Sequence, residues 1–563
     1  MGYINFAKAN CKNCYKCIRV CPVKAIKINN DQAEIVEELC IACGQCLLNC
    51  PQNAKTIKSD RPLVESFIKN GYLTAVSLAP SFAGLFNFSP LKLITALKKL
   101  GFNWVGETSV GADIIAKSYE KIYNSSEWDI AITTACPSVN LYFQKYHPDL
   151  LKYLIPVASP MIAHGRYIKE LLGKDTKVIF IGPCLAKKVE ANDAGSIDAV
   201  LSFEDLLTWI CDEKIDVENL DESPLDNYST PVASNYPIRG LSYNTIKNKS
   251  KKRQHITVSG IDQINQLIQA IKTGQLSNCW IEATACKESC IEGPGMPKNS
   301  NVIMVEERIR NYAKNKRTYK DVKEYTTKVF QHYPRIKLNL TIPSEEEIRS
   351  ILKKIGKNTE KEELNCGACG YNSCKEKAIA VYNGIANLYM CLPYMRSKAE
   401  SLAETVLKTT PNGIIVADEN LDILEMNKAA FQMFYLNENK IKGLNISNIM
   451  DADYYLQVLK SNKNIKEKII HLPNYDIIVK LSIYYLKDEH LLIGIYTDIT
   501  EKINEEKAKI ELKKKTAEMA QKVILKQMTI AQEIASLLGE TTAETRVMLT
   551  KLIDLLQGSD DVI

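Results

Sequence analysis

Cysteines are the residues of this chain whose spacing points most directly to chemistry. The sequence holds 18 cysteines in 563 residues, and 16 of them fall into four groups with spacings typical of metal ligation. Two copies of the run C-x2-C-x2-C-x3-C-P open the chain: Cys11, Cys14, Cys17 and Cys21 with Pro22, then Cys40, Cys43, Cys46 and Cys50 with Pro51. Thiols stay reduced in the cytosol, so such groups in a cytoplasmic protein favour metal ligation over disulfides.

The two N-terminal runs predict two [4Fe–4S] clusters. In runs of this kind the first three thiolates bind one cluster and the fourth, before the proline, binds the other. We therefore expect one cluster on Cys11, Cys14, Cys17 and Cys50, and a second on Cys40, Cys43, Cys46 and Cys21. Zinc is the alternative that a lone CxxC pair would suggest. The segment resembles bacterial two-cluster ferredoxins, which transfer single electrons.

Four further cysteines are scattered, but their sequence contexts are specific. They stand in Thr133-Thr-Ala-Cys136-Pro, in Gly182-Pro-Cys184-Leu-Ala-Lys187, and in Glu282-Ala-Thr-Ala-Cys286-Lys-Glu-Ser-Cys290. Each lies near a strand end or in a loop, where α/β folds place ligands. These stretches, in this order, resemble the three signature motifs of the [FeFe]-hydrogenase catalytic domain over about residues 73–300.

The resemblance implies an H-cluster, which is a [4Fe–4S] cubane joined to a diiron unit with carbonyl, cyanide and azadithiolate ligands. Cys136, Cys184, Cys286 and Cys290 would hold the cubane, and Cys290 would bridge to the diiron unit. Lys187 would hydrogen-bond one cyanide, and Pro80 and Ser81 would line the other. A hydrogenase-like domain that holds only cubanes is the alternative.

The sequence departs from active hydrogenases where protons should move. Ala135 occupies the position of the cysteine that passes protons to the cluster, and Tyr119 and Ile122 stand where the proton conduit has glutamates. A general acid or base must carry a titratable group, so we expect slow turnover, or another route through Glu120, Glu282 or water. Further departures from the family motifs are Met161, Gly182, Thr284, and Pro294 to Met296.

The last group is Cys366, Cys369, Cys374 and Cys391, with glycines between the first thiols that permit tight turns. It resembles a small four-cysteine [4Fe–4S] module, and zinc is again the alternative. Cys211 and Cys279 belong to no group, so we expect them to be buried small hydrophobes. The six histidines share no spacing and are expected in core or surface roles.

The elements that must position these groups follow from hydrophobic pattern and length. Residues 73–300 alternate strand-like runs, such as Thr74–Leu78 and 178–181, with helical pieces, which predicts α/β architecture with parallel sheet. We expect a multidomain α/β and α+β chain, divided as follows: 1–60, two-cluster ferredoxin domain; 73–300, two-lobed H-cluster domain; 301–360, mostly helical connector; 361–395, four-cysteine module; 403–500, PAS domain; 501–563, signalling or dimerisation helices.

Residues 403–500 resemble a PAS domain, with strands expected near 413–418, 423–426, 465–471, 477–485 and 491–497. A PAS domain without a ligand is favoured over one with a cofactor, although His471 and His490 lie in or beside strands. From Ile499 a helix follows with Ile503, Ile510, Ala517, Ile524, Ala531 and Leu538 at seven-residue spacing, which favours a dimer over a helical hairpin. Gly539 should end it, and 541–544 should cap a second helix.

The composition of the chain and the order of its expected domains limit the functions that it can have. A net charge of +6, 45% hydrophobic residues and no apolar membrane span or signal segment predict a soluble, cytoplasmic protein that binds neither nucleic acid nor membrane. The domain order resembles sensory-type [FeFe]-hydrogenases, which implies a hydrogen or redox sensor with weak reversible hydrogenase activity. The implied partners are hydrogen and protons, a redox protein such as ferredoxin, a separately encoded kinase or phosphatase, and a second copy of the chain. A catalytic hydrogenase with a regulatory tail and a non-enzymatic Fe–S protein are the alternatives.

Overall fold

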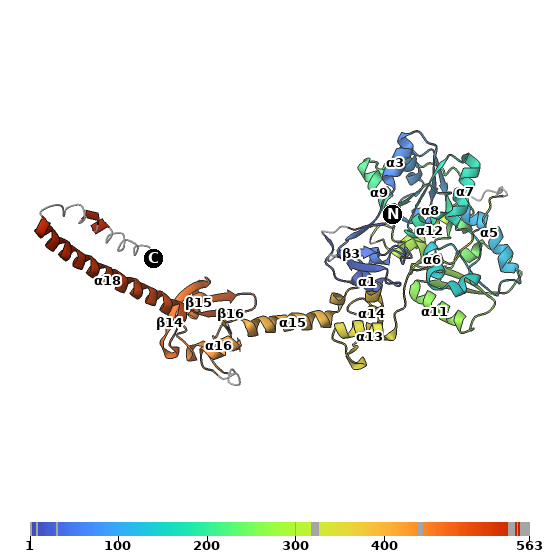
Figure 1. Cartoon of the computed structure of the whole chain (residues 1–563). Coiled ribbons are helices and arrows are strands. Elements are labelled where there is room, and N and C mark those ends of the chain that lie inside the picture. The colour runs from blue at the N-terminus through green and yellow to red at the C-terminus, as the bar shows by residue number, and fades with distance from the viewer. Residues whose placement is uncertain are drawn as a thin grey trace. The chain divides into compact units, whose positions relative to one another are not determined.

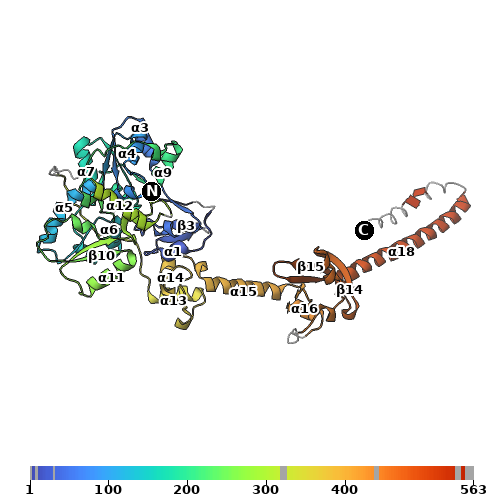
Figure 2. The same cartoon turned by 180° about the vertical axis from the view of Figure 1, so that it is seen from behind.

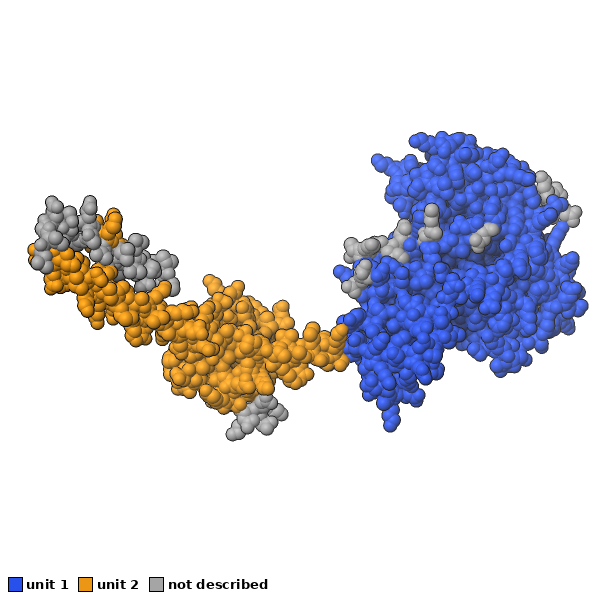
Figure 3. Space-filling view, viewed as in Figure 1, with its two compact units in different colours: residues 1–395 blue, residues 396–563 orange. Residues whose placement is uncertain are grey.

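The chain divides into two compact units, Met1–Met395 and Arg396–Ile563 (Figures 1 and 3). The computed structural model describes residues 3–6, 10–29, 32–298, 300–316, 326–436, 443–538, 547–548 and 550–551. All 18 cysteines belong to the first unit. No helix in these described stretches has the length and apolarity that a membrane crossing needs.

The two N-terminal cysteine runs fold alike. Strand β1 (Ile4–Phe6) pairs antiparallel with β4 (Lys55–Ile57), and β2 (Ile26–Asn29) pairs with β3 (Gln32–Ile35). A short helix follows each run's tight loop, α1 (Lys16–Val20) in the first and α2 (Gln45–Leu48) in the second. The residue before each helix, Tyr15 or Gly44, has a left-handed backbone, with φ of 57° and 74°. Each run therefore bends sharply between its second and third cysteines.

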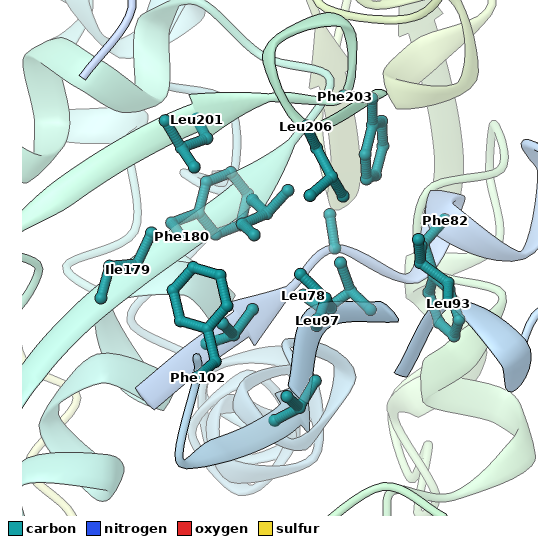
Figure 4. Packing of buried hydrophobic residues seen from close by; sticks show 14 of the residues in the cluster. Leu78, Phe82, Leu93, Leu97, Phe102, Ile179, Phe180, Leu201, Phe203 and Leu206 are labelled. Carbon is teal, nitrogen blue, oxygen red and sulfur yellow. The ribbon is translucent and has the colours of Figure 1, made fainter. Parts of the chain in front are cut away.

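The first lobe of the central region is a four-stranded parallel sheet in the order β6-β5-β8-β9. Its strands are almost wholly buried, as is typical of parallel sheets covered by helices. Figure 4 shows the packing of one part of its core, where Leu78, Phe180 and Phe203 gather from three elements. The strands are β5 (Thr74–Leu78), β6 (Trp104–Glu107), β8 (Lys177–Gly182) and β9 (Ala199–Ser202), and the helices around them are α3 (Arg61–Lys69), α4 (Lys92–Lys99), α7 (Pro160–Leu172), α8 (Ala186–Ala194) and α9 (Phe203–Asp212). Helix α5 (Ser109–Asn124) packs against α7 and the sheet of the second lobe.

The second lobe is a three-stranded parallel sheet in the order β10-β11-β7. In both cartoon views α11 lies at the end of the unit opposite α3 and α9 (Figures 1 and 2). Its elements are β7 (Ile130–Ile132), β10 (Gln254–Ser259), β11 (Cys279–Thr284), α6 (Pro137–Tyr146), α10 (Pro231–Ser234) and α11 (Ile261–Lys272). The two predicted α/β lobes are therefore present, and the predicted strands at 74–78, 130–133, 178–181 and 199–202 are confirmed to within one residue.

The segment 301–360 is helical only in part. Helix α12 (Val302–Asn315) packs on the first lobe, against the 3-10 turn η2 (Pro80–Gly84). Helix α13 (Glu345–Lys354) starts with a capping box formed by Ser344 and Glu347. Residues 326–343 contain neither α-helix nor strand. The expectation of a mostly helical segment was wrong there because two prolines, at 334 and 343, interrupt its helical pattern.

The four-cysteine region is built on α13 and α14 (Cys374–Tyr382), which pack against each other. Its small core includes Ile348, Leu352, Ala378 and the thiol of Cys391. Helix α15 (Leu392–Thr409) begins at the residue after Cys391 and continues into the second unit.

The second unit holds a five-stranded antiparallel sheet in the order β13-β12-β16-β15-β14. The five predicted strands are confirmed to within one residue as β12 (Gly413–Asp418), β13 (Ile423–Met426), β14 (Ile465–Leu472), β15 (Ile477–Leu486) and β16 (Leu491–Asp498), with α16 (Lys428–Met433) and α17 (Asp453–Ser461) beside them. The expected combination of α/β and α+β parts is thus confirmed.

The predicted long helix after the sheet is α18 (Thr500–Leu538). Most of its side chains are exposed, including large apolar ones such as Ile510 and Val523. Gly539 and the predicted cap at 541–544 lie outside the described residues.

Candidate functional site

A cavity of about 100 Å³ lies where strand ends from both lobes meet. Pro80 and Ser81 follow β5, Ala135 and Cys136 follow β7, Cys184 follows β8 and Cys290 follows β11. The carboxyl ends of parallel strands converge, which is why residues more than 200 positions apart in the sequence can share one site. The cavity wall holds these residues together with Lys187, Met161, Tyr236, Glu282 and Thr284.

The structure brings Cys136, Cys184, Cys286 and Cys290 together. Burial, and after it the neighbouring thiols Cys136 and Cys184, raises the pKa of Cys290 to about 12. Burial likewise raises the pKa of Cys184 to about 11. Cys290 is accessible to a water-sized sphere because it faces the cavity, but protein surrounds it on its other sides. Four thiolates in such surroundings are stable only when they bind cations, so this donor set fits an iron–sulfur cluster.

Two polar side chains in the cavity wall, those of Ser81 and Lys187, are available to a bound ligand. The hydroxyl of Ser81 is fully buried and has no hydrogen-bond partner among the described residues. The ammonium of Lys187 lies 2.7 Å from a carboxylate oxygen of Glu190 and 3.3 Å from the carbonyl of Ala135. A ligand-facing hydroxyl and a buried cation suit a bound anionic group. Glu190, which also accepts a hydrogen bond from Ser159 at 2.9 Å, orients Lys187. The three-residue spacing of Glu190 from Lys187 was the signal in the sequence for this ion pair, and we did not predict the role of Glu190.

Gly182 and Thr284, two departures from the family motifs, have local structural reasons. A Cβ at Gly182 would lie 2.6 Å from the ring of Phe180, so a large side chain could not stand there without rearrangement. The hydroxyl of Thr284 is hydrogen-bonded with Ser259 and Ser289 at 3.1 and 3.2 Å.

The residues at the positions of the expected proton conduit carry no group that titrates near neutral pH. Ala135 lies in the wall, where it offers no titratable group. Tyr119 is fully buried, its hydroxyl is 3.2 Å from that of Tyr236, and burial raises its pKa. Ile122 is half-buried, and Glu120 is bonded to Asn248 rather than facing the cavity.

Glu282 is the one carboxylate among the described residues of the cavity wall. It stands in β11, is 6% exposed, and lies 3.1 Å from Nε2 of His255 in the neighbouring strand β10. The backbone N–H of Tyr243 also donates to it. The ring of His255 stacks on that of Tyr243, with centroids 4.1 Å apart, and a quarter of its side chain is exposed. The hydrogen-bonded pair of His255 and Glu282 therefore reaches from the cavity to the protein surface. We expected only a core or surface role for His255, and the pairing of β10 with β11 brings its ring to Glu282.

The N-terminal thiols gather in two sets. Burial and then the thiols of Cys43, Cys21 and Cys40 raise the pKa of Cys46, so the fourth cysteine of the first run lies with the second run. Around Cys17, burial raises the pKa while the buried Lys55 opposes it, and the thiols of Cys14 and Cys11 add to the rise. No contact places Cys50 with this first set, so its membership remains a prediction. The arrangement suits two interleaved clusters.

The second N-terminal set lies beside the cavity. Ile41, Cys43 and Cys136 share one hydrophobic cluster. Burial, followed by the thiols of its own set and then by Cys43, raises the pKa of Cys286. Electrons could therefore pass between the cavity and the N-terminal region over a short path.

The remaining four cysteines, Cys366, Cys369, Cys374 and Cys391, enclose a small cavity of about 20 Å³ together with Lys357, Tyr371 and Lys377. Among the described residues, no three His, Cys, Asp or Glu side chains converge closely enough to hold a single metal ion. Thiolates of a [4Fe–4S] cluster bind separate irons and need not converge on one point.

Two residues of the sequence analysis lie outside every set. Cys279 is fully buried, as predicted, but Cys211 is exposed, so that prediction was wrong for Cys211. Its place in the last turn of α9 faces solvent, while Trp209 and Ile210 are buried. In the second unit His471 and His490 are exposed, and His490 lies 2.8 Å from Glu419.

Comparisons with known protein families match four parts of the chain. A family model for the C-terminal domain of the iron-only hydrogenase large subunit matches residues 73–242 and 234–294. A 4Fe-4S dicluster domain matches residues 3–51, an Fe–S cluster model matches 362–393, and the PAS fold matches 402–471.

Three relatives illustrate the range of similar proteins. Iron hydrogenase 1 of Clostridium pasteurianum is 26% identical over 282 residues, which are 40% of this chain and 49% of that protein. The periplasmic [Fe] hydrogenase large subunit of Nitratidesulfovibrio vulgaris is 26% identical over 376 residues, 55% of this chain and 89% of that protein. The mouse cytosolic iron-sulfur assembly component 3 is 22% identical over 299 residues, 40% of this chain and 62% of that protein. The chain thus spans about half the length of the first of these relatives.

Proposed function

We propose that this chain, which carries a 4Fe-4S dicluster domain, a PAS domain and the C-terminal domain typical of iron-only hydrogenases, is a hydrogen or redox sensor. It would catalyse 2H⁺ + 2e⁻ ⇌ H₂ slowly and pass its redox state to the PAS domain and α18. The observation that carries the proposal is the cavity wall, where Cys290, Lys187 and Ser81 stand together but Ala135 replaces a proton donor.

The residues of the cavity fit an H-cluster. Cys136, Cys184, Cys286 and Cys290 would hold its cubane, and Cys290 would also bridge to the diiron unit. Lys187 would donate to one cyanide, and the segment Pro80–Ser81 would face the other. When bound, the cluster supplies the irons that take up hydrogen and a bridging amine that serves as the nearest base. Three further [4Fe–4S] clusters would occupy the two N-terminal sets and the four-cysteine module.

The chain's own part in turnover is to hold the anionic group, exclude bulk water and move protons. Lys187, fixed by Glu190, supplies positive charge inside the wall. Glu282 is placed to exchange protons with the cavity, and His255 is placed to exchange them with solvent. A proton on this path crosses two side chains, whereas a thiol at position 135 would pass it to the cavity in one step. We therefore expect slow turnover, as suits a sensor.

The sensor would act through other molecules. Electrons would enter or leave by a redox protein such as ferredoxin, and a separately encoded kinase or phosphatase would respond to the PAS domain and α18. A second copy of the chain would cover the exposed apolar side chains of α18. In the PAS core the ring of Phe434 packs edge to face against Tyr475 and Tyr496, and Tyr455 and Tyr496 are hydrogen-bonded at 2.7 Å, which suits a PAS domain that binds no ligand.

Two other functions have support from particular observations. A catalytic hydrogenase with a regulatory tail would use the same cavity and a faster proton route. Hydrogen evolution on the order of hundreds of turnovers per second, within the usual enzyme range, would favour it over a sensor. A non-enzymatic Fe–S protein is suggested by the similarity to an iron-sulfur assembly component.

Infrared spectroscopy tests the proposal. We expect the protein matured with the diiron cofactor to show carbonyl and cyanide bands that shift under hydrogen. A Lys187→Met variant should alter the cyanide bands, whereas Lys188→Met should leave them, because Lys188 pairs with Asp60 away from the cavity. A spectrum of the loaded wild-type protein without these bands would contradict the H-cluster and favour the non-enzymatic alternative.

A further inference from the structure

The four-cysteine module contains a lysine in a place that a lysine rarely occupies. Lys377 is 1% exposed and lies on α14, one turn after Cys374. Side chains three positions apart share a helix face, so its ammonium points to the same side as that thiol. Lys377 lines the small cavity with all four cysteines of the module.

Burying this ammonium needs a nearby negative charge. Its nitrogen donates one hydrogen bond, at 3.0 Å, to the carbonyl of Leu388. No described carboxylate lies within ion-pair distance of it, and it shares the small cavity with the thiols of Cys391, Cys369 and Cys374. A buried charge without a counter-charge is strongly unfavourable. Lys377 is therefore the counter-ion of whatever anionic group the four thiolates form.

A second buried lysine lines the same cavity. Lys357 is 5% exposed, and its ammonium donates to the carbonyl of Glu362 at 2.6 Å. Two cations beside one thiolate set favour a state with additional negative charge. A [4Fe–4S] cluster becomes one unit more negative when it takes up an electron, so both lysines stabilise its reduced form.

The module packs directly on the first N-terminal run. The guanidinium of Arg19 donates to the carbonyl of Ala368 at 3.2 Å. Gly370 lies so close to Ile18 that an added Cβ would be 2.6 Å from that side chain. Tyr371, Cys369 and Cys17 share one hydrophobic cluster. The module therefore contacts the N-terminal region, whose second set lies beside the cavity.

In the sequence, a single helix connects the module with the strands of the second unit. Cys391 is buried in the module core, and α15 begins at the next residue and runs to Thr409, four residues before the first strand of the PAS sheet. A charge change at this thiolate set acts on the first turn of that helix.

From these contacts we infer that the four-cysteine module is the redox output site of the chain, where Lys377 favours electron uptake and α15 carries the change onward. The source of the electrons rests on the proposed function. Oxidation of one H₂ releases two protons and two electrons, and each cluster along the path accepts one electron at a time. The reduced cluster of the module is the end of this path within the described residues.

The test is a redox titration of the full-length protein reconstituted with iron and sulfide and followed by electron paramagnetic resonance. A Cys374→Ser variant identifies the signal of the module by its loss. In Lys377→Met, at the potential where the wild-type cluster is half reduced, we expect the ratio of reduced to oxidised module to fall about tenfold, a shift of about 59 mV for one electron. Lys357→Met should shift it in the same direction, and Lys377→Arg should restore the ratio.

Lys375→Met is the matched control, since Lys375 lies on the same helix but is half exposed and pairs with Glu345. Equal reduction potentials of the module in Lys377→Met, Lys357→Met and wild type would overturn the role of the lysines. If Cys374→Ser lost zinc rather than iron, the module would hold no iron–sulfur cluster and the inference would fail. The titration uses a chemical reductant, so it succeeds or fails independently of the hydrogen-dependent infrared bands.

Hydrogen–deuterium exchange tests the transmission. We expect exchange of 392–409 to differ between the oxidised and chemically reduced protein, and the difference to vanish in Cys374→Ser. Identical exchange in both redox states of the wild type would overturn α15 as the output element.

Discussion

Single residues around the cavity decide how fast a proton could reach it. Ala135 contributes a methyl group to the wall, and Glu282 contributes the carboxylate, hydrogen-bonded to His255. General acid–base catalysis contributes roughly 10²–10⁴-fold in rate when a titratable group is in reach. Adding a titratable group at position 135 and removing the one at position 282 should therefore change the rate in opposite directions.

Restoring a thiol at position 135 should speed turnover. We expect Ala135→Cys to raise hydrogen evolution by at least about tenfold, since a thiol can exchange a proton where a methyl cannot. The measurement is hydrogen production by the matured protein with a chemical reductant. Ala135→Ser controls for polarity without a group that titrates near neutral pH. No rise in the cysteine variant would mean that another step limits the rate.

Removing the carboxylate of Glu282 should slow turnover. We expect Glu282→Gln to lower the rate by about 10²-fold while the infrared bands persist, because the amide keeps hydrogen bonds but cannot exchange a proton. Glu120→Gln is the control, since Glu120 bonds Asn248 away from the cavity. Equal rates for both variants would exclude the Glu282 path.

The shape of the cavity depends on how closely the helices and strands around it approach one another. Helices α5 and α7 come together at Gly111, where an added Cβ would lie 1.9 Å from the carbonyl oxygen of Pro160. Pro160 and Met161 at the start of α7 line the cavity. The absence of a side chain at Gly111 thus lets α7 present its first turn to the site.

We predict that Gly111→Ala separates these helices. Overpacking of this kind costs about 1–3 kcal/mol, so the melting temperature should fall and the matured protein should retain less diiron cofactor. Differential scanning calorimetry and infrared band intensity measure the two effects. Lys117→Ala, an exposed position on the same helix, should change neither. A normal melting temperature with full band intensity in Gly111→Ala would contradict this account of the helix contact.

At the scale of the whole molecule, α18 leaves many apolar side chains uncovered. Ile510 is 60% exposed, and Met519, Val523 and Ile534 on the same helix are exposed as well. Seven-residue spacing of the line through Ile510 and Ile524 is typical of a helix that pairs with a copy of itself.

We therefore expect the chain to form dimers through α18. Replacing Ile510 and Ile524 with glutamate should convert dimers to monomers in sedimentation experiments, because paired helices would bring the carboxylates together. Lys509→Gln with Lys513→Gln makes the same two-unit change of net charge beside this line and should leave most dimers intact. Unchanged sedimentation of the isoleucine variant would show that this line of residues does not hold copies together.

The sequence alone was sufficient for features that depend on short spacing or on periodicity. The two C-x2-C-x2-C-x3-C-P runs indicated clusters because neighbouring thiols on one loop must lie close together. Four strands of the two lobes, at 74–78, 130–133, 178–181 and 199–202, followed from apolar runs between turns. The strands of the second unit agree with their predictions to within one residue.

Only the tertiary structure could decide contacts between distant segments. The pairing of His255 with Glu282 depends on the register of β10 with β11, and the seating of Gly370 on Ile18 joins residues more than 350 positions apart. The burial of Lys377 beside four thiols, in the same way, could not be distinguished from a solvated lysine by its neighbours in the sequence. Local spacing fixes which residues can bind a cluster, whereas the packing of whole elements fixes which charges and proton carriers surround it.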